Sequence, residues 1–206
     1  MEKRWVIKDA DEDKVNSLQQ DLKVHPVVCK LLVQRGIYTY EAARKFFRPV
    51  LTDLYDPFLM KDMQKAIDRI NTAIANNERI LIYGDYDVDG TTSVALAYSF
   101  FYSIYKNIDY YIPDRYLEGY GISTKGIDHA KQTECSLVIA LDCGIKAVDK
   151  IAYANTLGVD FIICDHHIPG DEVPAAFAVL DPHQKECNYP YKELSGCGIG
   201  FKLIQA

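Results

Sequence analysis

The chain has 206 residues, of which 49% are hydrophobic and 25% are charged, as in an ordinary globular protein. It contains no apolar run near the roughly 18 residues that cross a bilayer and no secretory signal after Met1, so a cytoplasmic protein with no membrane partner is expected. The formal net charge of −6 argues against a broadly positive nucleic-acid surface, but metal-binding carboxylates would add negative charge that bound cations cancel.

Residues 1–75 are predicted to form a helical N-terminal region. The polar segment up to about residue 20 is expected to be irregular. Apolar residues at helical spacing then predict three helices, which begin near Pro26, Thr39 and Met63. In the second of these, Phe46 and Phe47 are expected on the buried side.

Residues 76–206 change to an alternation of apolar strands and helices. Strands are predicted at 79–84, 108–112, 137–142, 159–164 and 176–180, and helices at 92–105, 124–132 and 145–157. This alternation predicts an α/β fold, a parallel five-stranded sheet with helices on both faces. The six cysteines include no Cys-x-x-Cys pair, so neither a disulfide framework nor a structural zinc site is expected.

Three aspartates, Asp85, Asp87 and Asp89, follow the first predicted strand. On an extended backbone, alternate residues point the same way, so these carboxylates are expected to converge on divalent cations. Gly90 is expected to permit a turn, and the hydroxyls of residues 91–93 to offer a phosphate site at a helix start. The alternatives are a solvated acidic turn and a calcium loop of the EF-hand type, but the latter needs a Glu where Leu96 stands.

Acidic and imidazole groups also follow two other predicted strands. Asp142 ends one strand, where its alternative role is to cap the next helix. Asp165, His166 and His167 end another, where a pair of solvated loop histidines is the alternative. The carboxyl ends of parallel strands share one edge, so these groups predict a metal site in which one histidine is a ligand. The other is expected either to hydrogen-bond the scissile phosphate or to support the ligands from behind. Imidazole among carboxylates favours manganese over magnesium or calcium.

Arg115 lies in the loop 113–121 after the second predicted strand. Its guanidinium suits a bidentate contact with phosphate, and the tyrosines of the loop suit stacking on bases. The alternative is an ordinary loop rich in Gly and Tyr.

The chain resembles the DHH phosphoesterase family in three segments: Asp85-Tyr86-Asp87-Val88-Asp89-Gly90, Asp142 in Leu-Asp-Cys-Gly-Ile, and Asp165-His166-His167. The loop with Arg115 and Glu118-Gly119-Tyr120-Gly121 resembles the RecJ-type branch, the single-strand-specific 5′→3′ DNA exonucleases. Further resemblance to that branch lies at Leu31-Leu32, Arg35-Gly36-Ile37, Asp56-Pro57-Phe58 and residues 194–202, so it covers nearly the whole chain.

The resemblance implies site residues and cofactors. Two manganese ions, or else magnesium, are expected on Asp85, Asp87, Asp89, Asp142 and His166, with Asp142 in the bridging place. Asp165, His166, His167 and Arg115 are implied in catalysis, with His167 near the substrate phosphate. Cys143 stands where the family more often has Asn.

The resemblance further implies hydrolysis of single-stranded DNA from its 5′ end in DNA repair and recombination, with a single-strand-binding protein and a helicase as partners. The chain ends in a helix pattern at 198–206 without a stop signal, so it is expected to be a fragment. The family's later aspartate ligand, its DHHA1 domain and its OB-like domain have no counterpart here, which leaves the fragment's own activity open. Alternatives are a phosphodiesterase of short oligonucleotides or cyclic dinucleotides, an inorganic pyrophosphatase, and a non-catalytic binding module of the same fold.

Overall fold

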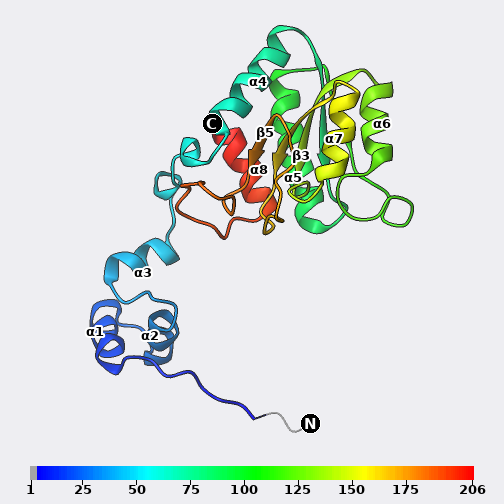
Figure 1. Cartoon of the computed structure of the whole chain (residues 1–206). Coiled ribbons are helices and arrows are strands. Elements are labelled where there is room, and N and C mark those ends of the chain that lie inside the picture. Colours follow the sequence, from blue (N-terminus) through cyan, green and yellow to red (C-terminus); the bar gives the residue numbers. More distant parts are fainter. Residues whose placement is uncertain (1–3) are drawn as a thin grey trace. The chain divides into compact units, whose positions relative to one another are not determined.

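The computed structural model describes residues 4–206, which divide after Leu54 into two compact units (Figure 1). No helix in this described part of the chain is long and apolar enough to cross a membrane.

The first unit is a small group of helices: α1 (Glu12–Leu22), α2 (Pro26–Val33), α3 (Tyr40–Phe47) and a 3-10 turn (Leu51–Asp53). Its core consists of Val15, Leu18, Cys29, Leu32 and Ala43. Residues 4–11 form no helix or strand, as expected, but the irregular part ends earlier than predicted. Asp11 caps α1 through the backbone N–H of Lys14, and Val15 and Leu18 are buried. The expectation that Phe46 and Phe47 face inward is wrong, since both side chains are about half exposed.

The second unit contains the sheet. Its elements are a 3-10 turn (Pro57–Leu59), α4 (Met63–Ala75), β1 (Arg79–Gly84), α5 (Val88–Ile104), β2 (Ile108–Tyr111), α6 (Thr124–Gln132), β3 (Cys135–Leu141), α7 (Val148–Thr156), β4 (Asp160–Cys164), β5 (Ala178–Leu180) and α8 (Gly196–Gln205).

The five strands are parallel and lie in the order β2-β1-β3-β4-β5. The chain leaves β1 toward one side to form β2 and then returns past β1 to form β3 on the other side. In an open α/β sheet, the carboxyl ends of the two strands at such a reversal are the preferred place for a ligand. The topology therefore predicts a ligand site at the carboxyl ends of β1 and β3.

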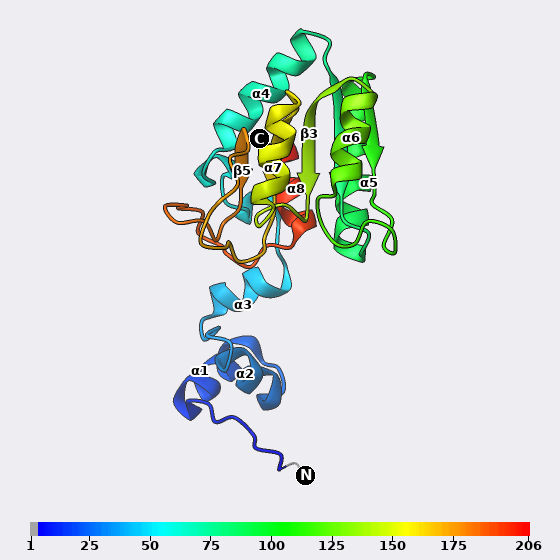
Figure 2. The ribbon, with the colours of Figure 1, turned by 45° about the vertical axis from the view of Figure 1, so that its right-hand side comes forward.

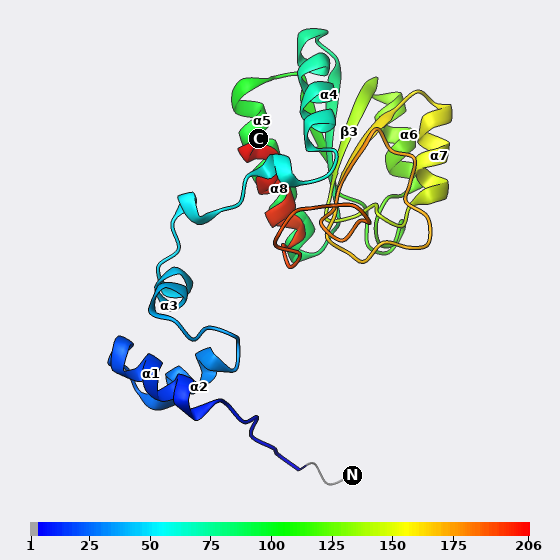
Figure 3. The same ribbon diagram turned by 60° about the vertical axis from the view of Figure 1, so that its left-hand side comes forward.

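Both faces of the sheet are buried under helices, as expected for a parallel sheet. The side chains of Ile80, Ile82 and Ile139 lie on the face of the sheet that α4, α5 and α8 cover. Those of Leu81 and Val138 lie on the opposite face, under α6 and α7. Figure 2 looks onto α6 and α7 with α5 and α8 behind the strands, and Figure 3 shows the two layers on opposite sides of β3. Burial of each such aliphatic side chain contributes roughly 1.5–3 kcal/mol to the free energy of folding. The predicted fold class is confirmed.

Helix α4 belongs to the sheet unit by its contacts. Met63, Ala66 and Ile70 lie in the same core cluster as β1 and β3. At the amino end of the sheet, Arg69 of α4 donates to Asp160 and to Glu78, each at 2.7 Å. The domain limit after residue 75 stays a prediction, but the side chains of α4 and the start of two strands are held together by this ion pair network.

We expect Arg69→Ala to lower the free energy of unfolding by about 2–3 kcal/mol. The change leaves two carboxylates without their shared cation, and the loss stays below that of a fully buried pair because Asp160 is partly exposed. Urea denaturation followed by circular dichroism measures it. Lys61→Ala is the control, because its pair with Glu186 is exposed and its loss should stay under about 1 kcal/mol. Equal losses in the two variants would contradict the importance of the Arg69 network.

Candidate metal centre

The turn from β1 into α5 places three aspartates in three different environments. Asp85 is fully buried, and its Oδ1 lies 3.4 Å from the backbone N–H of Gly121. Asp87 is exposed and caps α5 by accepting from the N–H of Gly90 at 2.9 Å. Asp89 lies in the first turn of α5 and accepts from the N–H groups of Gly196 and Cys197, each at 2.8 Å. Asp89 therefore binds the first turn of α8 as well as facing the site.

Two expectations about this segment are wrong because α5 begins at Val88, four residues earlier than predicted. The alternation of an extended strand ends at Asp87, so Asp89 comes to the site by a helical turn instead. The hydroxyls of Thr91, Thr92 and Ser93 are not available for phosphate at a helix start, since each donates to a backbone carbonyl one turn earlier.

Gly90 is needed for close approach and not for a turn. It lies inside α5, and a Cβ there would come within 2.5 Å of the carbonyl oxygen and 2.7 Å of the nitrogen of Asp85. The absence of a side chain at Gly90 lets the helix lie directly against the end of β1, where Asp85 is buried.

Asp142 follows β3 in a left-handed backbone conformation with φ +61°, which Asp tolerates better than most residues. Its N–H donates to the carbonyl of Cys164 at 2.8 Å, so the turn is tied to β4. Its side chain is buried, and its Oδ1 lies 3.1 Å from Nε2 of His166. The same nitrogen lies 3.8 Å from Oδ2 of Asp89. The ends of β1, β3 and β4 thus deliver two carboxylates and one imidazole to one point.

The electrostatics of this point disfavour several negative charges at once. Burial, followed by repulsion from Asp89 and Asp87, raises the pKa of Asp142 to about 8. Burial also raises the pKa of Asp85, with repulsion from Asp87 adding to it. Among the residues that the structure describes, Oδ2 of Asp85 and Oδ1 of Asp142 are buried oxygens that accept no hydrogen bond, although Nε2 of His166 faces the latter at 3.1 Å. Such oxygens fit a divalent cation. Its charge would offset the repulsion between the carboxylates, and its coordination would replace the missing hydrogen bonds.

Asp165 uses both of its carboxylate oxygens within the protein. Its Oδ1 accepts from the N–H of His166 at 2.7 Å and lies 2.7 Å from Nδ1 of His167. Its Oδ2 accepts from the N–H of Ile145 at 2.9 Å. Asp165 thus orients the two histidines and the loop after β3.

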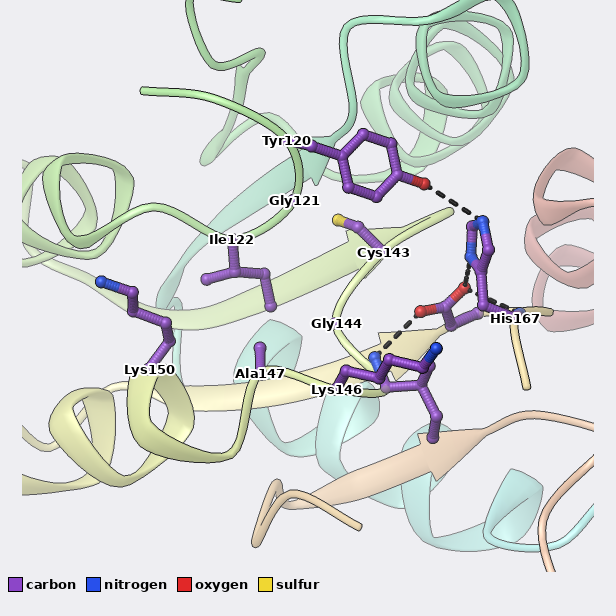
Figure 4. Close-up of a pocket in the computed structure, with 11 residues that line it drawn as sticks. Tyr120, Gly121, Ile122, Cys143, Gly144, Lys146, Ala147, Lys150 and His167 are labelled. Carbon is purple, nitrogen blue, oxygen red and sulfur yellow. Dashed lines mark hydrogen bonds and ion pairs between the residues drawn. The ribbon is translucent and has the colours of Figure 1, made fainter. Parts of the chain in front are cut away.

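His167 is held between two partners. Nδ1 faces Asp165, and Nε2 lies 3.1 Å from the hydroxyl of Tyr120 (Figure 4). Burial and the surrounding aspartates raise the pKa of Tyr120, so its phenol stays protonated and donates to Nε2. This arrangement assigns the proton of neutral His167 to Nδ1. Tyr120 was not expected from the sequence as a partner of His167, although it lies in the loop that carries Arg115.

The rings of His166 and His167 lie close together. Their centroids lie 4.5 Å apart, and ligand atoms of Asp142, His166 and His167 all lie within 4.8 Å of one another. The difference in role arises from the neighbours: His166 faces carboxylates at the strand ends, whereas His167 turns back to Asp165.

Arg115 is exposed, and its guanidinium carbon lies 5.3 Å from the ring centroid of Tyr86. The ring of Tyr86 in turn makes an edge contact with Tyr120 at 6.1 Å between centroids. Arg115 is therefore linked to the site by cation–π and aromatic contacts. The base of its loop is fixed by Glu118, which accepts from the hydroxyls of Tyr111 and Ser123.

Asp181 is an acidic residue that was not predicted from the sequence. It follows β5 directly, is fully buried and has one oxygen that accepts no hydrogen bond among the described residues. Burial, with repulsion from Asp165, raises its pKa to about 7. The signal that could have found it is the one used for the other strands, an acidic residue immediately after a buried apolar run.

We expect Gly196→Ala to destabilise the chain by about 1–3 kcal/mol through steric conflict. A Cβ on Gly196 would come within 2.5 Å of Cβ and Cγ of Asp142, which is buried and cannot move aside. Gly198→Ala is a matched control in the same helix, because its Cβ would meet only the flexible side chain of Leu194 at 3.3 Å. Thermal or urea unfolding compares the two, and a neutral Gly196→Ala would show that Asp142 is not confined by α8.

Known proteins resemble the chain over its whole length. It is 47% identical over 203 residues to the single-stranded-DNA-specific exonuclease RecJ of Bacillus subtilis, which covers 98% of this chain and 26% of that protein. It is 32% identical over 208 positions to the RecJ of Escherichia coli, with 100% of this chain and 35% of that protein covered. The chain thus spans about a quarter to a third of the length of these relatives.

Solved structures resemble its fold. A crystal structure of exonuclease RecJ bound to manganese matches 70% of this chain and 37% of its own, with a TM-score of 0.64 and 28% identity. RecJ from Thermus thermophilus in complex with Mn²⁺ matches 94% of this chain and 26% of its own, with a TM-score of 0.74; at 23% identity this likeness concerns the fold. A model of the DHH family, N-terminal domain, matches residues 79–206. The chain therefore belongs to the DHH family.

Proposed function

We propose that the chain carries the metal-binding half of a phosphodiesterase that degrades single-stranded DNA from its 5′ end. The observation that carries the proposal is that ligand atoms of Asp142, His166 and His167 lie within 4.8 Å of one another at the carboxyl edge of the sheet. Buried oxygens of Asp142 and Asp85 at this edge accept no hydrogen bond among the described residues. The similarity to RecJ exonucleases over 98% of the chain supports the choice of single-stranded DNA as substrate.

We assign the ion-binding set to Asp85, Asp87, Asp89, Asp142 and His166. Asp142 is the best candidate for a bridging ligand, because it lies beside both Asp89 and Asp87 and next to His166. Asp89 already accepts two N–H groups, but each of its oxygens retains a second lone pair. Manganese is the preferred ion for a mixed imidazole and carboxylate set, with magnesium as the alternative. Divalent ions bound here would activate water and stabilise charge on the phosphoryl oxygens.

The remaining groups hold the phosphate in place. His167 is fixed by Asp165 and Tyr120 and presents its ring beside Asp142. We assign to it a contact with a phosphate oxygen, which its imidazolium form would make by donating from Nε2 in place of the bond with Tyr120. Arg115, with its long side chain over Tyr86, is suited to a bidentate contact with another oxygen. Both contacts would orient the phosphate so that water can attack the phosphorus opposite the leaving oxygen.

Partners follow from the substrate. Single strands arise where a helicase separates duplex DNA, and a single-strand-binding protein covers them, so we propose both as partners in cytoplasmic DNA repair and recombination. The similarity to RecJ exonucleases supports single-stranded DNA as the substrate, and the partners and the process are proposed from that substrate.

We expect Asp142→Asn to weaken Mn²⁺ binding to this chain by roughly 100-fold or more, because it removes a buried charge from the ligand set. Isothermal titration calorimetry with Mn²⁺ measures the change. Asp171→Asn removes the same charge from an exposed position away from the strand ends and should leave the affinity unchanged. Equal affinities for the chain and for Asp142→Asn would refute the assignment of Asp142.

We expect activity when this chain replaces the matching first part of the B. subtilis relative, since 47% identity makes the two parts close equivalents. The chimaera should degrade 5′-labelled single-stranded DNA with Mn²⁺ and spare duplex DNA, and Asp142→Asn within it should abolish degradation. A preference for dinucleotides, or equal action on duplex DNA, would overturn the single-strand exonuclease assignment.

A further inference from the structure

A hollow of about 310 Å³ opens beside the candidate metal centre (Figure 4). It lies between the loop after β2 and the segment that leads from β3 into α7. The residues on which its chemistry depends are Tyr120, Ile122, Cys143, Gly144, Lys146 and Lys150. His167 and Asp165 also contribute to its wall, so the hollow and the candidate metal centre share a boundary.

One part of the hollow is apolar and aromatic. Ile122 and Cys143 are buried, and the ring of Tyr120 stands beside them with its hydroxyl turned to His167. Gly144 has φ +116°, and a Cβ there would come within 2.9 Å of Ile122, so a larger residue would narrow the hollow. An aromatic ring and an aliphatic side chain on one wall suit the flat face of a nucleobase or the carbon face of a sugar.

Two lysines line the hollow at opposite ends. Lys146 is exposed and has no hydrogen-bond or ion-pair partner among residues 4–206. Lys150 donates to the hydroxyl of Thr124 at 2.6 Å, a neutral partner that leaves its charge uncompensated. Figure 4 shows Lys150 at the end of the hollow away from His167. The bond to Thr124 also links α7 to α6, but that structural role does not explain why a second lysine lines the same hollow.

Charge and size restrict the occupant. In a chain with a net charge of −6, two uncompensated lysines beside an acidic metal centre favour an anion that extends away from the centre. A volume of 310 Å³ lies at the lower end of the roughly 300–1,000 Å³ of small-molecule sites, which is enough for one nucleotide and too small for a base pair with its backbone.

We infer that the hollow binds one nucleotide unit of the substrate, adjacent to the phosphate held at the metal centre. The base or sugar lies against Tyr120 and Ile122, and the next phosphate along the strand lies at the end of the hollow that Lys150 lines. Lys146 lies on the His167 side of the hollow, toward the phosphate at the metal centre. The inference rests on the proposed function for the identity of the strand, and it adds a place where a single unpaired nucleotide is held.

Thymidine 3′,5′-bisphosphate is a suitable probe, because it offers one phosphate to each end of the site and contains no internucleotide bond to cleave. With Mg²⁺ present, its titration into the ¹⁵N-labelled chain should shift the amide signals of Gly144, Lys146 and Ile122. The double variant Lys146→Ala, Lys150→Ala should bind it at least about tenfold more weakly, because two charge-assisted contacts are lost. Lys185→Ala, an exposed lysine outside the hollow, should bind it as the unchanged chain does.

Two further ligands, thymidine and inorganic phosphate, test the nucleoside contacts and the phosphate contacts separately. Thymidine should bind weakly to both the chain and the double variant, since it lacks the phosphates. If inorganic phosphate binds as tightly as the bisphosphate and with the same dependence on the lysines, the hollow is only an anion site and the inference is overturned. Signal shifts confined to other surfaces would overturn it as well.

The chimaera with the B. subtilis relative separates this inference from the proposed function. In it, the double lysine variant should raise the KM for single-stranded DNA about tenfold or more while Mn²⁺ affinity is unchanged. Cleavage with an unaltered KM would overturn the nucleotide site and leave the exonuclease proposal intact. Lysine-dependent binding of the bisphosphate without any cleavage would support the nucleotide site and reject the exonuclease proposal.

Discussion

The structure depends on the burial of several acidic side chains at the carboxyl edge of one parallel sheet. Asp85, Asp142, Asp165 and Asp181 are all almost completely buried, and each follows a strand directly. Parallel strands force these positions together, since every strand ends at the same edge. Burial of like charges in a low dielectric is costly, and the raised pKa values of Asp142 and Asp181 express that cost. The edge is therefore built for cations.

The buried carboxylates fall into two kinds. Asp165 uses both oxygens on backbone N–H groups and on His167, and so fixes the loop that carries the histidines. Asp89 likewise uses both oxygens, on the first turn of α8. Asp85 and Asp142 instead each keep a buried oxygen without a hydrogen bond among the described residues. Asp165 thus positions the site, and Asp85 and Asp142 keep an oxygen for a cation. Asp89 both holds α8 and faces His166.

The contact between Asp89 and α8 joins the start of α5 to the last helix, across more than 100 positions of the chain. The residue at the start of α8 is glycine because Gly196 lies directly against Asp142. On the other side of the centre, Tyr120 and His167 separate the acidic edge from the hollow that Lys146 and Lys150 line. An acidic centre for cations thus borders a cationic hollow, an arrangement that suits a polyanion held at two successive phosphates.

The sequence by itself determined the α/β class, the parallel sheet and the strand ends that carry Asp85, Asp142 and Asp165, because apolar runs and their period depend only on local spacing. It did not determine that Asp89 lies in a helix, since the start of α5 depends on capping by Asp87 and on the fit of Gly90 against Asp85. Only the tertiary structure decided the partners: Asp165 with Ile145, His167 with Tyr120, and Asp89 with α8. These contacts join segments distant in the chain, and no local pattern encodes which of several acidic groups will be satisfied by backbone N–H groups and which will keep an oxygen for a cation.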